Sequence, residues 1–292
     1  EAMVRALPYV TDHSKIDVVP SVQHGNHLAH SIGLGAMGLH TYFAKNHMYY
    51  GSPESLDFTN IYFLLLNYYT LKASNKIAKE RGESFHNFEN SKYADGSYFD
   101  KYLNQTWAPK YDKVRDLFKN IHIPTQADWQ ALKEDVMKNG LYHQNRMAVA
   151  PNGSISYIND TSASLQPIVN RIEDRQEKKI GTIYYPAPGL SNDTMPYYQS
   201  AYDIDMRKVI DVYAAAQQHV DQGMAMTLFM RSTIPAGLYP WKDGRTDKMT
   251  TRDLNILRNY AHYKGIKSIY YIRTYTDDQE EIGSNACESC SI

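Results

Sequence analysis

The stretch DMRKVIDVYAAAQQHVDQGMAMTLFM, residues 205–230, carries the pattern that decides the fold class. Asp205 can cap a helix that runs to about Gln222, and Gly223 ends that helix. The nearly unbroken apolar run Met224–Met230 then predicts a strand that is buried on both faces. A helix, a glycine stop and a buried strand in this order are typical of parallel strands covered by helices.

The same unit recurs twice elsewhere in the chain, which favours an α/β fold over an all-helical one. The two copies are a helix from Thr125 to about Lys138 with Gly140 and the strand Arg146–Ala150, and a helix from Thr250 or Thr251 to about Tyr263 with Gly265 and the strand Ile266–Arg273. Chemistry in this fold class gathers in the loops after the strands, which here begin at Pro151, Arg231 and Thr274.

One further long helix is predicted from about Phe58 to Arg81. Asp57 or Thr59 can cap this helix, and Gly82 ends it. The first fifty residues show no clear helical or strand period, so we expect an irregular segment there.

Composition excludes several classes of protein. The 292 residues are 42% hydrophobic and 22% charged, with a net charge of −1, as in a globular protein without a nucleic-acid or anionic-membrane footprint. The longest apolar run, Ile61–Leu66, is far shorter than the ~20 residues that cross a bilayer. Two cysteines cannot build a disulfide scaffold or a four-thiolate metal site, and they favour a cytoplasmic protein. Because the chain begins at Glu1 rather than Met, we expect it to be part of a longer protein.

Two glycine-containing motifs invite a nucleotide or phosphate interpretation. Gly33-x-Gly35-x-x-Gly38 matches the dinucleotide fingerprint, but no convincing strand precedes it, so close packing of small residues is the better interpretation. The loop Pro151–Ser156 follows a predicted strand, and its backbone N–H groups and hydroxyls can cradle an anion. It lacks the lysine of an ATPase P-loop, and an ordinary polar turn remains the alternative.

The two cysteines form a C-x-x-C pair, Cys287 and Cys290, close to the chain end. Such a pair can cycle between dithiol and disulfide. Zinc binding would need two more ligands, and the acidic, small-residue segment before the pair indicates a mobile arm. The alternative is two incidental cysteines in a tail.

Tyr270 and Tyr271 form one of five adjacent tyrosine pairs in the chain, which has 25 tyrosines in all. Tyrosine favours strands, so this pair is not distinguished by spacing alone. On a regular strand one of the two rings would face inward.

Taken together, the loop, the tyrosine strand and the dithiol tail resemble the C-terminal portion of the large (alpha) subunit of class Ib ribonucleoside-diphosphate reductases. The matching stretches are SIGLGAMGLH (31–40), YGSPESLDFTNIYF (50–63), LKASNKIAKERGE (71–83), RMAVAPNGSISYIND (146–160), GIKSIYYIRT (265–274) and ACESCSI (286–292). The resemblance implies the C-terminal half of a ten-stranded α/β barrel with helices outside, formed by residues 1–276, and a mobile redox-active tail over residues 277–292.

The resemblance also implies an activity, the radical-based reduction of ribonucleoside diphosphates to deoxyribonucleoside diphosphates, which are DNA precursors. Tyr270 and Tyr271 would relay the radical, and Cys287 and Cys290 would re-reduce the active-site disulfide. The residues expected to hold the substrate diphosphate are Pro151, Asn152, Gly153, Ser154, Ile155 and Ser156. Asn152 stands where the family pattern has threonine.

The expected partners are a small subunit that carries a metal and tyrosyl radical, a glutaredoxin-like or thioredoxin-like reductant, and a second copy of the complete subunit. We expect no cofactor in this chain, no DNA binding and no membrane association. No cysteine precedes Cys287, so the catalytic cysteine loop and the nucleotide effector site are expected upstream, and the chain alone is expected to be inactive. The alternatives are a non-enzymatic α/β module and a thiol–disulfide carrier.

Overall fold

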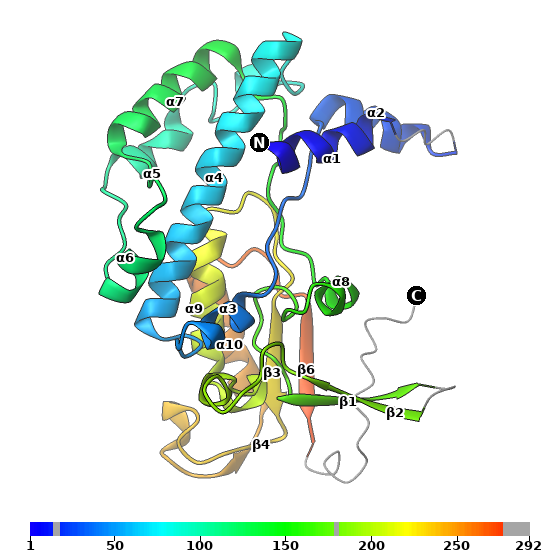
Figure 1. The fold of residues 1–292 in the computed structure, drawn as a ribbon, viewed down its shortest axis with the longest axis vertical. Helices are drawn as coiled ribbons and strands as arrows, with labels where there is room; N and C mark the ends of the chain where they lie inside the picture. The colour runs from blue at the N-terminus through cyan, green and yellow to red at the C-terminus, as the bar shows by residue number, and fades with distance from the viewer. Residues whose placement is uncertain (14–17, 178–180, 277–292) are drawn as a thin grey trace. The chain divides into compact units, whose positions relative to one another are not determined.

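The computed structural model describes residues 1–13, 18–177 and 181–276 (Figure 1). These residues form two compact units. The first unit contains Glu1–Gly35, Asp57–Ala148 and His219–Gln222, and the second contains Ala36–Leu56, Val149–Gln218 and the chain from Gly223 onward. Helices and strands are mixed along the chain, which confirms the α/β class at this coarse level.

The first unit is built mainly from helices. The amide of Asn75 on the long helix α4 donates to the carbonyl of Asp135 on α7 and to that of Gly140, which ties the two helices together. The elements of this unit are α1 (Ala2–His13), α2 (Pro20–Ala29), most of α4 (Pro53–Arg81), η1 (Phe88–Asn90), η2 (Ser97–Phe99), α5 (Asp100–Leu103), α6 (Asp112–Phe118) and α7 (Gln126–Asn139).

The prediction that the first fifty residues are irregular is wrong, because α1, α2 and α3 (Leu39–Lys45) lie there. α1 buries only Val4 and Pro8, and Val4 joins an apolar cluster with Ile77 on α4. α2 buries no residue. Both helices therefore bury little of their surface, although apolar residues of α1 such as Met3, Leu7 and Val10 recur at helical spacing.

Helix α4 begins at Pro53, five residues before the predicted start. Proline is compatible with a first turn, where its missing N–H would have no intrahelical partner. The predicted caps Asp57 and Thr59 are wrong, since both lie inside the helix. One carboxylate oxygen of Asp57 instead accepts the backbone N–H groups of Lys110 (2.6 Å) and Tyr111 (3.1 Å).

The other predicted helix starts are confirmed. Thr125 and Thr250 each form a capping box with an aspartate three residues later, and the carboxylate of Asp205 accepts the N–H of Arg207. α9 (Met206–Gln217) ends five residues earlier than predicted. The residues after it leave the helix, and the Asp221 carboxylate accepts the N–H groups of Arg146 and Met147 at 2.9 Å each.

The second unit contains all the described strands. Its elements are α3, α8 (Gly153–Ile158), β1 (Ile172–Glu177), β2 (Gly181–Pro186), η3 (Met195–Tyr197), η4 (Ala201–Asp203), α9, β3 (Thr227–Arg231), β4 (Thr233–Ile234), η5 (Pro240–Lys242), β5 (Asp247–Lys248), α10 (Thr251–Tyr263) and β6 (Tyr271–Tyr275). The sequence did not predict the antiparallel pairs β1–β2 and β4–β5.

The parallel arrangement is confirmed where β3 and β6 run side by side (Figure 1), with Thr227 opposite Tyr271. The predicted strand Arg146–Ala150 forms only isolated parallel bridges, Leu34–Met147 in the first unit and Val149–Met224 in the second. Within residues 1–13, 18–177 and 181–276, the strands do not close a barrel, and β6 pairs only with β3. The ten-stranded barrel stays a prediction.

The small residues of the glycine fingerprint are needed for close packing, as the sequence indicates. A Cβ on Gly33 would lie 3.3 Å from the Cβ of Ala148, and one on Gly38 would lie 2.1 Å from the Thr161 hydroxyl. Gly38 also has a φ of +82° at the start of α3. Thr161, the residue that a Cβ on Gly38 would meet, lies in a loop, whereas the sequence favoured close packing against a helix.

Helix α3 supplies a buried histidine that fastens a distant loop. The Nδ1 atom of His40 accepts the N–H of Ile168 (2.9 Å), and its Nε2 atom lies 3.1 Å from the carbonyl of Tyr197. Because Nδ1 accepts, the proton lies on Nε2, which donates to Tyr197, and the ring is neutral. His40 is fully buried, and this burial lowers its pKa to about 4.

Acid should therefore destabilise the second unit through His40. As the pH falls from 6.5 to about 4, the unfolded chain protonates this imidazole while the folded protein keeps it neutral. The free energy of unfolding should fall across that window by about 3 kcal/mol for this group. In His40→Asn, whose side-chain oxygen can still accept the Ile168 N–H, urea unfolding between about pH 7 and pH 4 should show a shallower pH dependence.

The exposed His24 provides the control, and His24→Asn should leave the pH dependence unchanged. A slope in His40→Asn equal to that of the unmodified protein would show that the buried imidazole is not the group that titrates.

Candidate active site

The loop Pro151–Ser156 becomes the start of the short helix α8. Asn152 caps this helix with a φ of +33°, a conformation that L-residues rarely adopt. The N–H of Ser156 donates to the carbonyl of Asn152 (3.1 Å) and is the first intrahelical bond. The N–H groups of Gly153, Ser154 and Ile155 have no intrahelical acceptor by geometry, which is the arrangement that binds anions at helix starts.

Two of the predicted side-chain ligands are committed to the protein itself. The side-chain oxygen of Asn152 accepts the N–H of Ser164 (3.0 Å), and the buried hydroxyl of Ser156 donates to the carbonyl of Gly153 (2.6 Å). Pro151, Ser154 and Ile155 are exposed. The turn therefore presents the backbone of residues 153–155 to a ligand, rather than the Asn152 or Ser156 side chain.

The loop after α8 is held by α3, which sequence reasoning missed. Thr41 and Ser162 exchange two hydrogen bonds, in which each backbone N–H donates to the other residue's hydroxyl (3.1 and 2.9 Å). The Tyr50 hydroxyl donates to the carbonyl of Leu165 (2.6 Å). These contacts join residues more than 100 positions apart, and only the small-residue stretch before α3 gave a sequence signal of close packing there.

The loop also concentrates backbone strain. Asn152, Asp160 and Ser164 all have positive φ values of 33°, 44° and 52°. Each such residue costs of order 1–3 kcal/mol, and strain of this kind persists where the surrounding structure holds it. The hydrogen bonds from α3 and from Asn152 to Ser164 supply that hold.

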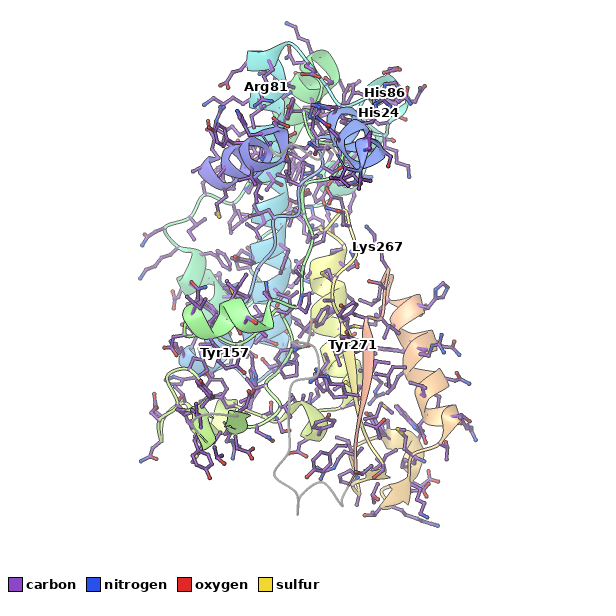
Figure 2. All side chains as sticks on the ribbon, turned by 90° about the vertical axis from the view of Figure 1, so that its right-hand side faces the viewer. His24, Arg81, His86, Tyr157, Lys267 and Tyr271 are labelled. Carbon is purple, nitrogen blue, oxygen red and sulfur yellow. The ribbon has the colours of Figure 1, made fainter. Side chains whose placement is uncertain are left out.

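Tyr270 and Tyr271 lie at the start of β6, and Figure 2 labels Tyr271 there. Their ring centroids are 4.2 Å apart with an interplanar angle of 62°, and the residues are 52% and 42% exposed. The expectation that one ring faces inward is wrong. Tyr270 precedes the regular strand, and the backbone N–H groups of both residues point to the carbonyl of Met226 (2.8 and 3.4 Å).

Contacts with one segment relate the α8 turn to the tyrosine pair inside the second unit. Val149, on the chain that leads into the turn, bridges Met224. The N–H of Tyr270 donates to the carbonyl of Met226 (2.8 Å), and Thr227 lies opposite Tyr271. Both predicted sites therefore adjoin the segment Met224–Thr227.

The remaining predicted site residues, Cys287 and Cys290, lie outside the described residues. Within residues 1–13, 18–177 and 181–276, no group of three or more His, Cys, Asp or Glu side chains is arranged to hold a metal ion. No helix in the same residues combines the length and apolar composition needed to span a membrane.

Known proteins match this chain over nearly all its length. Residues 1–272 match the family model of the ribonucleotide reductase barrel domain. Ribonucleoside-diphosphate reductase subunits alpha are similar to it, with 45% identity over 98% of the chain in Bacillus subtilis, 44% over 99% in Mycoplasma pneumoniae and 31% over 96% in Helicobacter pylori. The chain spans only 38%, 39% and 32% of these relatives, respectively. On this match, the chain belongs to the ribonucleotide reductase family and corresponds to its barrel domain.

Proposed function

We propose that this chain is part of the catalytic subunit of a ribonucleoside-diphosphate reductase, in which it holds the substrate diphosphate and relays a radical. The observation that carries the proposal is that the chain leading into the α8 turn and the tyrosine pair both contact the segment Met224–Thr227. A substrate held at the turn would then lie on the same side of the second unit's strands as an oxidisable side chain. Such positioning is what a reaction through a reactive intermediate requires.

The α8 turn is the proposed diphosphate site. The backbone N–H groups at the start of α8, from Gly153 to Ile155, would donate to phosphate oxygens. Asn152 acts here through its left-handed backbone and its bond to Ser164, not as a ligand. Ser156 has the same structural role through its bond to the carbonyl of Gly153.

The tyrosine pair is the proposed end of a radical relay from a small subunit. An exposed phenol can give up an electron and its proton together, and the two rings are in contact at 4.2 Å. The small subunit would supply the metal and its tyrosyl radical. The catalytic cysteine and the nucleotide effector site would lie in parts of the subunit outside this chain.

Cys287 and Cys290 are proposed to carry electrons from a glutaredoxin-like or thioredoxin-like protein to the active-site disulfide. Thiol–disulfide exchange needs direct contact between sulfur atoms, so a dithiol at the end of a tail suits this transfer. The enzyme would work in the cytoplasm as a dimer of complete subunits.

Replacing either relay tyrosine should abolish turnover without loss of substrate binding. In the complete subunit assembled with its small subunit, Tyr270→Phe and Tyr271→Phe should each lower kcat by about 100-fold or more, or about 3 kcal/mol in the barrier. Phenylalanine keeps the ring but has no oxidisable hydroxyl. Nucleotide binding measured by calorimetry should be unchanged.

Tyr263→Phe is the matched control, because Tyr263 is 84% exposed at the end of α10 in the same unit. Full turnover in Tyr270→Phe or Tyr271→Phe would rule out the relay.

The tail thiols should matter only for protein reductants. Cys287→Ser in the complete enzyme should stop multiple turnovers with thioredoxin or glutaredoxin while sparing dithiothreitol, which reaches the buried disulfide directly. Ser289→Ala changes one of the two residues between the cysteines and should have no effect. Equal loss with both kinds of reductant would show that Cys287 is not a shuttle.

A further inference from the structure

A buried arginine organises the polar centre of the first unit. Arg146 is fully buried, and its guanidinium lies 3.1 Å from the carboxylate of Asp221. The guanidinium also donates to the hydroxyl of Tyr93 (2.9 Å) and to the side-chain oxygen of Asn67 (3.1 Å). Arginine carries donors only, so every group that faces it here must accept.

That constraint fixes the direction of a chain of hydrogen bonds. Because the oxygen of Asn67 accepts from Arg146, the NH₂ group of Asn67 is the group that donates to the Tyr102 hydroxyl (2.8 Å). The Tyr102 hydroxyl can then donate its own proton to Nδ1 of His219, which lies 3.2 Å away. Nε2 of His219 carries the ring proton and donates to the side-chain oxygen of Asn60 (3.0 Å).

Tyr102 is therefore a buried phenol whose proton is directed at a neutral imidazole. Both residues are at most 2% exposed. Burial lowers the pKa of His219 and raises the pKa of Tyr102, so neither group is charged at neutral pH. A phenol is oxidised most easily when its proton has an acceptor in place, because the product is then a neutral phenoxyl.

Tyr102 also begins a line of aromatic contacts that leads to the surface. Its ring stacks on Trp129 with centroids 4.1 Å apart and an interplanar angle of 10°. Trp129 meets Tyr68 at 4.9 Å, and Tyr68 meets Tyr69 at 5.2 Å. Trp129 is fully buried, whereas Tyr69 is 40% exposed.

We propose that Tyr102 and His219 form a redox-active pair from which Trp129 and Tyr68 carry oxidising equivalents to Tyr69 at the surface. The function would be to discharge strong one-electron oxidants, such as protein-bound radicals, before they damage the interior. In the first step the oxidant takes one electron from Tyr102, and the phenolic proton moves to Nδ1 of His219.

In the following steps an electron passes from Trp129 to Tyr102, and the proton returns from His219 to the phenol. An electron then passes from Tyr69 to Trp129 across the Tyr68 ring, which keeps its phenolic proton, and Tyr69 releases its own proton to water. A thiol or ascorbate in solution then donates a hydrogen atom to the Tyr69 phenoxyl. The net result is one electron delivered to the oxidant and one hydrogen atom taken from the reductant.

Cations lie near several of these rings. The Arg146 guanidinium lies 5.6 Å from the ring of Tyr93 and donates to its hydroxyl, which disfavours loss of an electron there. Lys101 over Tyr102 (5.2 Å) and Lys72 over Tyr68 (6.0 Å) also oppose oxidation, and at Tyr102 this is offset by His219, which can accept the phenolic proton. The inference does not rest on the proposed reductase function, because its test supplies the oxidant.

The experiment generates the oxidising equivalent beside Tyr93, whose ring meets Tyr98 at 4.4 Å, and Tyr98 in turn meets Tyr102 at 5.8 Å. The chain has only two cysteines, so Cys287→Ser and Cys290→Ser leave a background in which Lys92→Cys, an exposed site next to Tyr93, takes a single ruthenium bipyridyl label. A flash with a sacrificial acceptor generates ruthenium(III). A nitroso spin trap then marks the tyrosines that become radicals, and peptide mass spectrometry locates them.

Tyr69 should carry most of the trapped radical in this background. Trp129→Phe keeps an aromatic ring but removes the relay site, and His219→Asn keeps a hydrogen-bond acceptor that is not a base. Each should lower the Tyr69 adduct by about tenfold, as a barrier higher by about 1.4 kcal/mol would.

Trp241→Phe and His143→Asn are the matched controls. Trp241 stacks on Tyr239 in the second unit, away from the line. His143 is as buried as His219, but its Nδ1 is bonded to the hydroxyl of Ser74 rather than to a phenol. Both should leave the Tyr69 adduct unchanged. Equal Tyr69 labelling in Trp129→Phe or His219→Asn and in the background protein would overturn the proposal.

Discussion

The buried, neutral imidazole of His40 is the constraint on which the candidate active site depends. It accepts an N–H from Ile168 and donates to the carbonyl of Tyr197, so it joins two chain segments that lie more than 120 residues away. Thr41 on the same helix exchanges two hydrogen bonds with Ser162. The strained loop after α8 can persist because these bonds hold it, and the N–H groups of the α8 turn keep their direction as a result.

A second polar centre shapes the first unit in a different way. The Arg146–Asp221 ion pair is buried, and hydrogen bonds to the guanidinium offset part of the cost of burying it. The acceptors are the hydroxyls of Tyr93 and Thr70 and the oxygen of Asn67, while the Nε–H of Arg146 has no acceptor among the described residues. This polar centre explains part of the large number of tyrosines, because tyrosine hydroxyls form hydrogen bonds with its side chains and tyrosine rings pack on one another there.

Features that depend on a few neighbouring residues could be predicted from the sequence. The caps Thr125, Asp205 and Thr250 act on N–H groups within three residues, so their patterns alone located three helix starts. The parallel pairing of β3 with β6 also followed from the order of helix, glycine and strand. The β1–β2 hairpin could not be predicted, because backbone pairing supports strands without a clear apolar alternation. α1 was missed although Met3, Leu7 and Val10 recur at helical spacing.

The candidate site was predictable as a motif but not as a geometry. The anion-binding turn could be proposed from Pro151–Ser156, yet only the structure shows that Asn152 and Ser156 turn their side chains to the protein. The tyrosine pair could be chosen from five such pairs only by resemblance to a family. His40 gave no sequence signal at all, because its partners lie far away in the chain.

A structure of the complete subunit with a bound ribonucleoside diphosphate tests the central claim most directly. Phosphate oxygens should lie within about 3 Å of the N–H groups of Gly153, Ser154 and Ile155, with the Asn152 side chain still bonded to Ser164. Phosphates bound elsewhere, with no ligand atom at the α8 turn, would contradict it.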